Sequence, residues 1–327
     1  MKIVHVCLST KGFSGSERYL IDLINYQSEK HECYFIKHKK NTSKQFKIQL
    51  KKNIKVIEVR SIFEKLILNF FINKIKPNIV HTHLGAAGKS IKKKNYFKLI
   101  ATVHMNYKKK HYINHDGLLV TNPTQEKLAK ESFSKNVKKI YHWACERKKP
   151  NHALNVREIL KIPNKAYVFG SIGRFHKQKN FEIIINTFQK INLENAYLIL
   201  VGNGHDEFLK YECNNIKILP QQEIVSNYYE AFDCFVMASI WETFGITLIE
   251  AMTFGLPIIT TIHEGNEEWI KDYQVETFEI NNANQLLDKF HIQYSYGKRK
   301  IKYKLDKFDY YKTCNEIEEF YKYLIKN

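Results

Sequence analysis

Two carboxylates with seven residues between them, Glu242 and Glu250, stand on either side of a predicted helix start. Gly245 permits a tight turn, and the apolar spacing over 246–254 predicts a short helix that the segment 255–257, Gly-Leu-Pro, ends. A helix N-terminus offers free N–H groups and partial positive charge, which suit a phosphate, and nearby carboxylates can accept hydrogen bonds from sugar hydroxyls. The segment therefore predicts a nucleotide-sugar site. A local cap at Glu242 and a solvated Glu250 would also fit this pair taken alone.

A basic loop earlier in the chain has the residue types that bind a diphosphate. It runs over 170–180, after the apolar stretch 166–169 and before the helical pattern 181–191. This order predicts a strand, a loop and a helix, and it brings basic side chains beside a helix N-terminus that favours phosphate. We therefore expect Arg174 and Lys179 to clamp a diphosphate.

Two further apolar segments predict strands of the same sheet. Residues 197–201 form a buried-strand pattern that ends at Gly202, and residues 216–219 form another that ends at Leu219. Together with the strand before the basic loop, they predict three βα units. Because ligands bind at the carboxyl ends of strands in open parallel sheets, we expect these strand ends to form one wall of a nucleotide crevice.

With these residues in place, the chain resembles the retaining family 4 glycosyltransferases, whose fold is two facing Rossmann-like domains with the donor in the cleft between them. The resemblance covers nearly the whole chain and is sharpest over 170–257. It implies that Arg174 and Lys179 hold the donor diphosphate, that Glu242 contacts the transferred sugar, and that Glu250 binds the ribose hydroxyls. The further donor-side residues that it implies are Gly15, Gly202, Leu219, Phe244, Gly245 and Thr247.

The N-terminal segment predicts a strand, a loop and a helix. Residues 2–8, Lys-Ile-Val-His-Val-Cys-Leu, predict a buried strand, the loop 9–15 contains glycine, and the helix is expected to begin with Ser16 as its N-cap. The loop resembles the family's glycine-rich loop, which faces the donor phosphates and the acceptor. Ser14 stands where the first of the usual paired glycines would be, so only Gly15 carries over.

Histidines end the two apolar strands predicted over 77–83 and 99–104. For His81 and His83, a structural role and a functional role are both open. The resemblance implies that His104 points into the cleft and touches the donor sugar near the reacting centre. Its role there would be hydrogen bonding and electrostatic support.

Length and composition agree with an α/β fold of two Rossmann-like domains that have parallel sheets. The chain has 327 residues and 44% hydrophobic residues, which is enough for two separate cores. We expect an N-terminal domain over 1–146 and a nucleotide-sugar domain over 147–307, with a linker near 144–150. An amphipathic helix over 308–327 is expected to pack back on the first domain.

The positive charge lies almost wholly in the first half of the chain. Residues 1–150 hold 32 Lys and Arg against 10 Asp and Glu, a net charge of +22, whereas residues 151–327 have a net charge of −3. In the resembled family the first domain carries the acceptor. We therefore expect Lys108, Lys109 and Lys110 to mark an acceptor or membrane side that attracts anionic lipid headgroups or a phosphorylated acceptor. A solvated lysine-rich face is the alternative.

The spacing of the cysteines and the length of the apolar runs indicate in which cellular compartment the protein works. The six cysteines have no C-x-x-C spacing, so we expect no zinc site, no disulfide framework and a reducing compartment. No apolar run approaches the roughly 20 residues that span a bilayer. The apolar helix predicted over 62–75 could lie on a membrane, but packing on the first sheet is favoured. A cytoplasmic protein, peripheral at the inner face of the plasma membrane, is expected.

The expected reaction needs no metal cofactor. The chain has no D-x-D motif, so cationic side chains and a helix N-terminus should meet the diphosphate charge. The resemblance implies a retaining transfer of a hexose or N-acetylhexosamine from a nucleotide sugar, with UDP as the leading choice. The acceptor would be a hydroxyl of a lipopolysaccharide, capsule or glycolipid precursor.

Two other classes of protein remain open. A sugar-nucleotide epimerase can share this fold, but it needs no acceptor groove. A nucleic-acid-binding protein would explain the charge and not the order of the acidic and basic site residues, so no nucleic-acid partner is expected. The sequence leaves the oligomeric state open.

Overall fold

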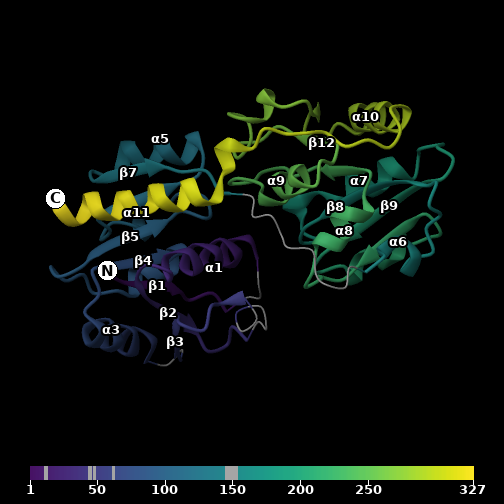
Figure 1. Cartoon of the computed structure of the whole chain (residues 1–327). Coiled ribbons are helices and arrows are strands. Elements are labelled where there is room, and N and C mark those ends of the chain that lie inside the picture. The colour runs from purple at the N-terminus through teal and green to yellow at the C-terminus, as the bar shows by residue number, and fades with distance from the viewer. Residues whose placement is uncertain (11–13, 43–45, 47–48, 61–62, 144–153) are drawn as a thin grey trace. The chain divides into compact units, whose positions relative to one another are not determined.

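The computed structural model describes residues 1–10, 14–42, 46, 49–60, 63–143 and 154–327, which form two compact units (Figure 1). Unit 1 comprises Met1–His142 and Lys307–Asn327, and unit 2 comprises Trp143–Asp306. The expected linker over 144–150, and with it the boundary after residue 146, lies outside the described residues. Each unit contains one wholly parallel sheet with helices beside it, which confirms the predicted α/β fold class.

Unit 1 has a seven-stranded sheet in the order β3-β2-β1-β4-β5-β6-β7. The first six positions follow the strand order of a Rossmann fold. Its strands are β1 (Lys2–Cys7), β2 (Glu32–His38), β3 (Lys55–Val59), β4 (Ile79–His83), β5 (Lys98–Thr102), β6 (Gly117–Val120) and β7 (Asn136–Lys139). Its helices are α1 (Gly15–Gln27), α3 (Glu64–Ile75), α4 (Gly85–Ser90), the 3-10 turn η2 (Lys109–His111), α5 (Pro123–Ser132) and α11 (Tyr310–Lys326).

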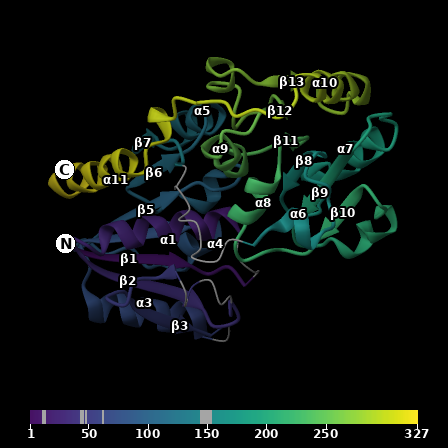
Figure 2. The same cartoon turned by 45° about the vertical axis from the view of Figure 1, so that its right-hand side comes forward.

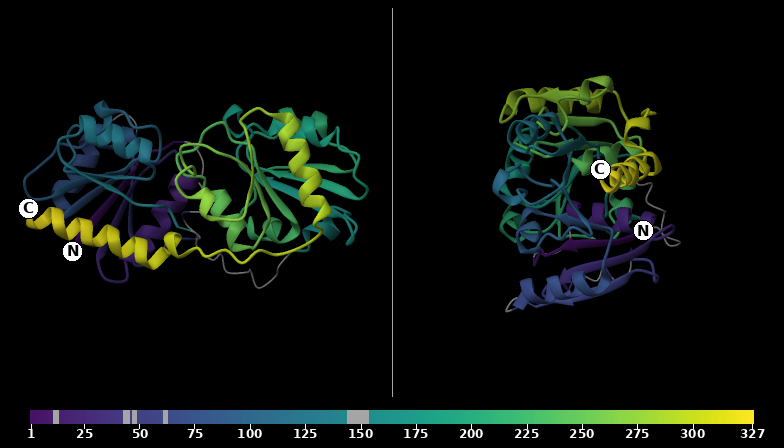
Figure 3. Two further views of the ribbon diagram at one scale, coloured as in Figure 1. Left: turned by 90° about the horizontal axis from the view of Figure 1, so that it is seen from above. Right: turned by 90° about the vertical axis from the view of Figure 1, so that its left-hand side faces the viewer.

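The two faces of this sheet differ in chemistry. One face is an apolar core in which strand residues such as Val4 and Val80 pack with Leu68 and Ile72 of α3. Helix α3 therefore packs on the sheet, which is the arrangement that the sequence favours. The other face lies beneath α1 and α11, and the two helices also contact each other (Figures 1 and 3). That face carries a layer of buried histidines.

Unit 2 repeats the Rossmann strand order as β10-β9-β8-β11-β12-β13 (Figure 2). Its strands are β8 (Tyr167–Ile172), β9 (Ala196–Val201), β10 (Ile216–Leu219), β11 (Cys234–Met237), β12 (Ile258–Thr261) and β13 (Glu276–Phe278). Its helices are α6 (Val156–Ile159), α7 (Phe181–Phe188), α8 (Ser226–Ala231), α9 (Ile246–Thr253) and α10 (Ala283–Ser295). The 3-10 turns in the described part of this unit are η3 (Lys177–Lys179), η4 (Asp206–Tyr211), η5 (Ile270–Asp272) and η6 (Asp306–Phe308), and η6 continues into unit 1.

Helices cover both faces of the unit 2 sheet. On one face, aromatic and aliphatic residues of β8 and β9 form a core with α7 and α10, as Phe169 does with Phe290 at a ring-centroid distance of 4.7 Å. On the other face, a Cβ at Gly170 would lie 2.3 Å from the Phe232 ring, so this glycine lets the chain after α8 approach the sheet. Both cores hold the strand ends in place.

Several helix ends differ from the sequence predictions by a few residues. Ser16 is not the N-cap of α1, because the helix begins at Gly15 and Ser14 caps it. The N–H of Ser14 donates to Glu17 Oε2 at 3.2 Å, and this reciprocal capping box needs a carboxylate three residues after the cap. Helix α7 ends at Phe188 and not at residue 191.

Candidate functional site

Lys179 and Glu242, which lie 63 positions apart in the sequence, form an ion pair in unit 2. Lys179 Nζ lies 2.5 Å from Glu242 Oε1, and their side chains are only 15% and 11% exposed. The Ser239 hydroxyl also donates to Glu242 Oε1, at 2.9 Å. The carboxylate is therefore held by a cation and a hydroxyl in a largely buried position.

Hydrogen bonds between two loops bring this pair together. The loop after β8 contains η3, and the N–H of Ile240 donates to the Gln178 carbonyl at 2.8 Å. In return, Gln178 Nε2 donates to the Trp241 carbonyl at 2.9 Å. Because β8 and β11 are neighbours in the sheet, the loops that follow them meet at the same edge.

Gly245 begins helix α9 in a conformation that glycine favours. Its φ is 88° in the left-handed region, where a Cβ is strained. The loop after β12 packs against the same turn, because a Cβ at Gly265 would lie 2.5 Å from the Phe244 nitrogen. Phe244 is buried, and its ring lies 6.0 Å from that of Trp269. The start of α9 is thus fixed from two sides.

Glu250 and Thr247 belong to α9 itself. Glu250 is buried and accepts a hydrogen bond of 2.9 Å from the Tyr229 hydroxyl on α8. The Thr247 hydroxyl is buried and has no hydrogen-bond partner within the part of the chain that the structure describes. A buried carboxylate and an unused hydroxyl on one helix can both take up hydrogen bonds from a ligand.

The ends of the neighbouring strands also meet. The Gly202 N–H donates to the Leu219 carbonyl at 3.0 Å, which joins the ends of β9 and β10. A Cβ at Gly202 would lie only 1.6 Å from the Gly173 carbonyl oxygen, so the chain passes β8 there without room for a side chain. Arg174 follows Gly173 and is exposed. The predicted donor-side residues of unit 2 thus gather at one edge of its sheet.

His263 was not among the predicted site residues. It lies in the loop after β12, and its Nδ1 accepts a hydrogen bond of 3.2 Å from the Gly265 N–H. Burial lowers its pKa to about 4, even though Glu242 nearby favours the protonated form, so the ring is neutral at pH 7. The only sequence feature that could have indicated His263 as a site residue is its position two residues after the end of β12.

In unit 1, Gly15 is exposed in the first turn of α1, and residue 12 of the expected loop lies outside the described residues. His104 follows β5 and is 9% exposed. Its ring stands 4.9 Å from that of Tyr19, edge to face. Burial lowers the pKa of His104 to about 3, so this histidine is also neutral at pH 7.

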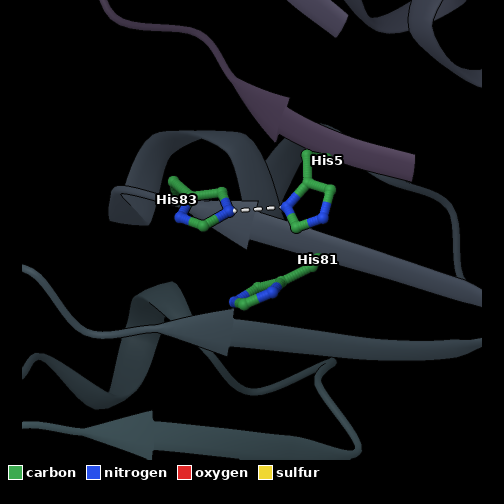
Figure 4. A group of neighbouring side chains, drawn as sticks. All are labelled: His5, His81 and His83. Atoms are coloured by element: carbon green, nitrogen blue, oxygen red, sulfur yellow. Dashed lines mark hydrogen bonds between the residues drawn. The ribbon is translucent and has the colours of Figure 1, made fainter. Parts of the chain in front are cut away.

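Three histidines of unit 1 form a group that could hold a metal ion, the one such group found among the described residues (Figure 4). One ring nitrogen from each of His5, His81 and His83 lies within 4.8 Å of the other two. All three side chains are fully buried, and burial lowers their pKa values, so each ring is neutral. Neutral imidazoles are ligands for zinc and related transition metals.

The basic surface of unit 1 includes the predicted lysines. Lys108, Lys109 and Lys110 are all exposed, at and beside η2. Helix α3 also turns apolar side chains outward, since Leu66 is 65% exposed and Phe70 is 61% exposed. None of the helices in the described ranges has both the length and the apolar character that a bilayer crossing requires.

Comparison with known proteins shows which family unit 2 is similar to. Residues 154–299 match the family described as Glycosyl transferases group 1. Unit 2 is therefore similar to a glycosyltransferase group 1 domain over most of its length. This match includes the Lys179–Glu242 pair, Glu250 and the start of α9.

Solved structures extend the likeness to both units. The structure of Anabaena HepE in complex with UDP and glucose has a TM-score of 0.80, with 16% identity, and covers 99% of this chain and 100% of that one. The protein thus has the glycosyltransferase B fold.

The sequence relatives are distant. The lipopolysaccharide core biosynthesis glycosyltransferase LpsD of Rhizobium meliloti is 24% identical over 305 residues, which cover 86% of this chain and 84% of LpsD. An uncharacterized glycosyltransferase of Methanocaldococcus jannaschii is 26% identical over 231 residues. That alignment spans 58% of this chain and 57% of the archaeal protein.

Proposed function

We propose that the protein is a retaining glycosyltransferase that moves a hexose or N-acetylhexosamine from a UDP-sugar to a hydroxyl of a cell-surface glycan precursor. The observation that carries this proposal is the buried Lys179–Glu242 pair beside the start of α9, within a glycosyltransferase group 1 domain. HepE binds UDP and glucose, and LpsD acts in lipopolysaccharide core biosynthesis. These likenesses favour a UDP donor and a lipopolysaccharide, capsule or glycolipid acceptor.

The side chains of unit 2 would have separate roles in binding the diphosphate, the sugar and the ribose. Arg174 and Lys179 would neutralise the diphosphate, and the N–H groups at the start of α9 would add to its stabilisation. Glu242 would contact the sugar, and Glu250 would accept hydrogen bonds from the ribose. As the carbon–oxygen bond to the diphosphate breaks, the sugar gains positive charge, and the acceptor hydroxyl adds on the same face. The leaving phosphate takes the hydroxyl proton.

The test is a screen of purified protein against nucleotide sugars, read as release of the nucleoside diphosphate. We expect turnover with a UDP-sugar, and we expect it to persist in EDTA because cationic side chains take the place of a metal at the diphosphate. Loss of turnover in EDTA with recovery in Mg²⁺ or Mn²⁺ would contradict the metal-independent mechanism. Interconversion of two UDP-sugars without an acceptor would point to an epimerase.

Glu250→Ala is expected to raise the donor KM about tenfold or more and to change kcat little. The reason is that hydrogen bonds to the ribose form equally in the ground state and the transition state, and a hydrogen bond to a charged group contributes about 1.5–3 kcal/mol. Steady-state kinetics with varied donor measures both constants. Tyr229→Phe, which removes only the neighbouring hydroxyl donor, is the control. An unchanged donor KM in Glu250→Ala would remove the proposed role.

We further propose that unit 1 contacts an anionic membrane surface, which places the protein in the cytoplasm at the inner face of the plasma membrane. The net charge of +22 over residues 1–150, the exposed lysines of η2 and the outward apolar side chains of α3 support this. Lysines attract anionic headgroups, and aromatic and aliphatic side chains can enter the interface.

Replacing Lys108, Lys109 and Lys110 together by glutamine should weaken binding to vesicles that contain phosphatidylglycerol. Each lysine contributes about 1 kcal/mol at an anionic surface, so the loss should reach at most about a hundredfold at low salt and less at physiological salt. Vesicle co-sedimentation at two salt concentrations measures it, and diphosphate release from the donor should stay unchanged. The matched control replaces three exposed lysines of unit 2, Lys161, Lys165 and Lys190. Equal losses of vesicle binding in the two variants would show that binding depends only on the net charge of the protein and not on these three lysines.

A further inference from the structure

His263 in unit 2 carries a buried N–H group for which the described part of the chain supplies no acceptor. The Gly265 N–H donates to His263 Nδ1 at 3.2 Å, so this nitrogen is bare. Burial lowers the pKa of the ring to about 4, and a neutral imidazole with a bare Nδ1 has its proton on Nε2. Because unpaired buried donors are rare and destabilising, we expect an acceptor to reach Nε2 in another state of the protein.

The loop after β12 fixes the position of the His263 ring. The His263 N–H donates to Asn266 Oδ1 at 2.9 Å, and the Asn266 N–H donates to the His263 carbonyl at 2.9 Å. Asn266 Nδ2 also donates to the Thr261 carbonyl at 3.0 Å. Since the loop holds the ring in this way, an acceptor has to move to the ring.

The ring of His263 faces the turn that carries Glu242. A Cβ at Gly245 would lie 3.7 Å from His263 Cε1 and 3.9 Å from Nε2, and a Cβ at Gly265 would lie 2.7 Å from the Glu242 carbonyl oxygen. Burial is the main cause of the lowered pKa of His263. The charge of Glu242 raises this pKa and that of Lys179 lowers it, so both side chains act on the ring. Glu242 is thus an acceptor that a small movement can bring to Nε2.

The ion pair of Lys179 and Glu242 has to open if each residue is to meet the donor. Lys179 Nζ lies 2.5 Å from Glu242 Oε1, and the Ser239 hydroxyl donates to the same oxygen at 2.9 Å. When Lys179 turns to a diphosphate, the Ser239 hydroxyl remains with the carboxylate. A largely buried carboxylate that loses its cation is strongly destabilised unless another donor replaces it.

We propose that His263 is a positioning residue, which donates from Nε2 to Glu242 when Lys179 leaves this carboxylate for the donor diphosphate. The functional half of this inference rests on the proposed function, in which Lys179 meets the diphosphate and Glu242 the transferred sugar. A neutral donor holds the carboxylate in place without cancelling its charge. The negative charge of Glu242 then stays available to a sugar that becomes positive.

Nitrogen-15 NMR of histidine in the full-length protein tests the contact without any transfer reaction. UDP is the probe, because it carries the diphosphate and no sugar. We expect the His263 proton on Nε2, and we expect its signal to move downfield when UDP binds, since a hydrogen bond to a carboxylate deshields the proton. His291, exposed on α10, is the internal reference. An Nδ1–H form in the free protein, or an unmoved Nε2–H signal while UDP binds, would overturn the proposal.

Lys179→Met tests the same contact without a ligand. Loss of the cation should release Glu242, so the Nε2–H signal of His263 should lie downfield in the absence of UDP. The matched variant Lys179→Met with Glu242→Leu also lacks the acceptor, and its signal should lie where it does in the free protein. The same signal in both variants would contradict the contact. If no UDP binds, the proposed function fails and this pair of variants decides the contact; if Lys179→Met does not fold in a urea titration, the UDP titration decides it.

Two substitutions of His263 separate its donor from its support of the loop. An Asn side chain accepts from the N–H two residues further on, so His263→Asn keeps the contact with Gly265 and removes the donor. A Gln amide reaches further, so His263→Gln keeps a donor near the position of Nε2.

We expect His263→Asn to lower kcat about ten- to a hundredfold with a small change in donor KM, the factor that corresponds to one hydrogen bond to a charged group. His263→Gln should recover most of this loss, and the control His291→Asn should leave both constants unchanged. Diphosphate release with varied UDP-hexose measures them. Full activity in His263→Asn, or equal losses in the two His263 variants, would overturn the functional half of the proposal.

Discussion

Replacing Lys179 by alanine is expected to lower kcat/KM for the nucleotide sugar about 10²–10³-fold. A cation placed where charge develops on the leaving diphosphate contributes roughly 2.7–4 kcal/mol to transition-state stabilisation, as removal of a single preorganised donor does in other enzymes. Arg174 is exposed, so its charge is better screened by water and Arg174→Ala should lose less. Initial rates of diphosphate release measure both variants.

The same substitution should also destabilise unit 2, and the two effects need to be separated. Removing Lys179 leaves Glu242 largely buried without its cation, and breaking a buried pair from one side costs about 3–5 kcal/mol. The double variant Lys179→Met with Glu242→Gln removes both charges and should recover much of that loss in stability. It should stay as inactive as the single variant. Activity that returns with stability would mean that the ion pair only supports the fold.

Gly202→Ala should lower the free energy of unfolding of unit 2 by more than about 3 kcal/mol. The new Cβ would lie 1.6 Å from the Gly173 carbonyl oxygen, and backbone atoms can move apart only by breaking the contacts of β8 and β9. All three tryptophans of the chain, Trp143, Trp241 and Trp269, belong to unit 2. Fluorescence of Trp241 and Trp269 in urea therefore reports on this unit.

Gly297→Ala is the control for that experiment. Gly297 has a φ of 67°, but nothing lies within 4 Å of its added Cβ, so only backbone strain of about 1–2 kcal/mol is expected. Similar losses in the two variants would show that the loop at Gly202 moves aside, and that the close approach of the two strand ends contributes little.

Strands β1, β4, β5, β8 and β9 could be predicted from the sequence because they are almost wholly buried and therefore read as short apolar runs. The edge strands β3 and β7 are partly exposed, and their sequences did not predict them. Strand order also follows from this fold class, and it brings the ends of β8, β9 and β11 to one edge of the sheet. The basic loop, the turn at Gly245 and the acidic residues of 242–250 could be placed there before any coordinates.

The contacts across that edge could not be predicted in the same way. Lys179 and Glu242 were assigned to the phosphate and the sugar, and their mutual pairing depends on two loops that exchange backbone hydrogen bonds. The close approach of Gly265 to Phe244 is possible because glycine has no side chain, and the periodicity of the sequence does not reveal such a contact.

The position of α11 sets an order for folding during synthesis. Unit 2 is made from one continuous segment, so all of its strands are synthesised before α11. The fold of unit 1 cannot be completed before α11 is synthesised, because Tyr321 of α11 forms a hydrogen bond with His81 and α11 helps to cover the histidine face of the sheet. Until then, that face is open to water and its imidazoles can take up protons. We therefore expect unit 1 to complete its folding after unit 2 and the histidine face of its sheet to be sensitive to acid until α11 is in place.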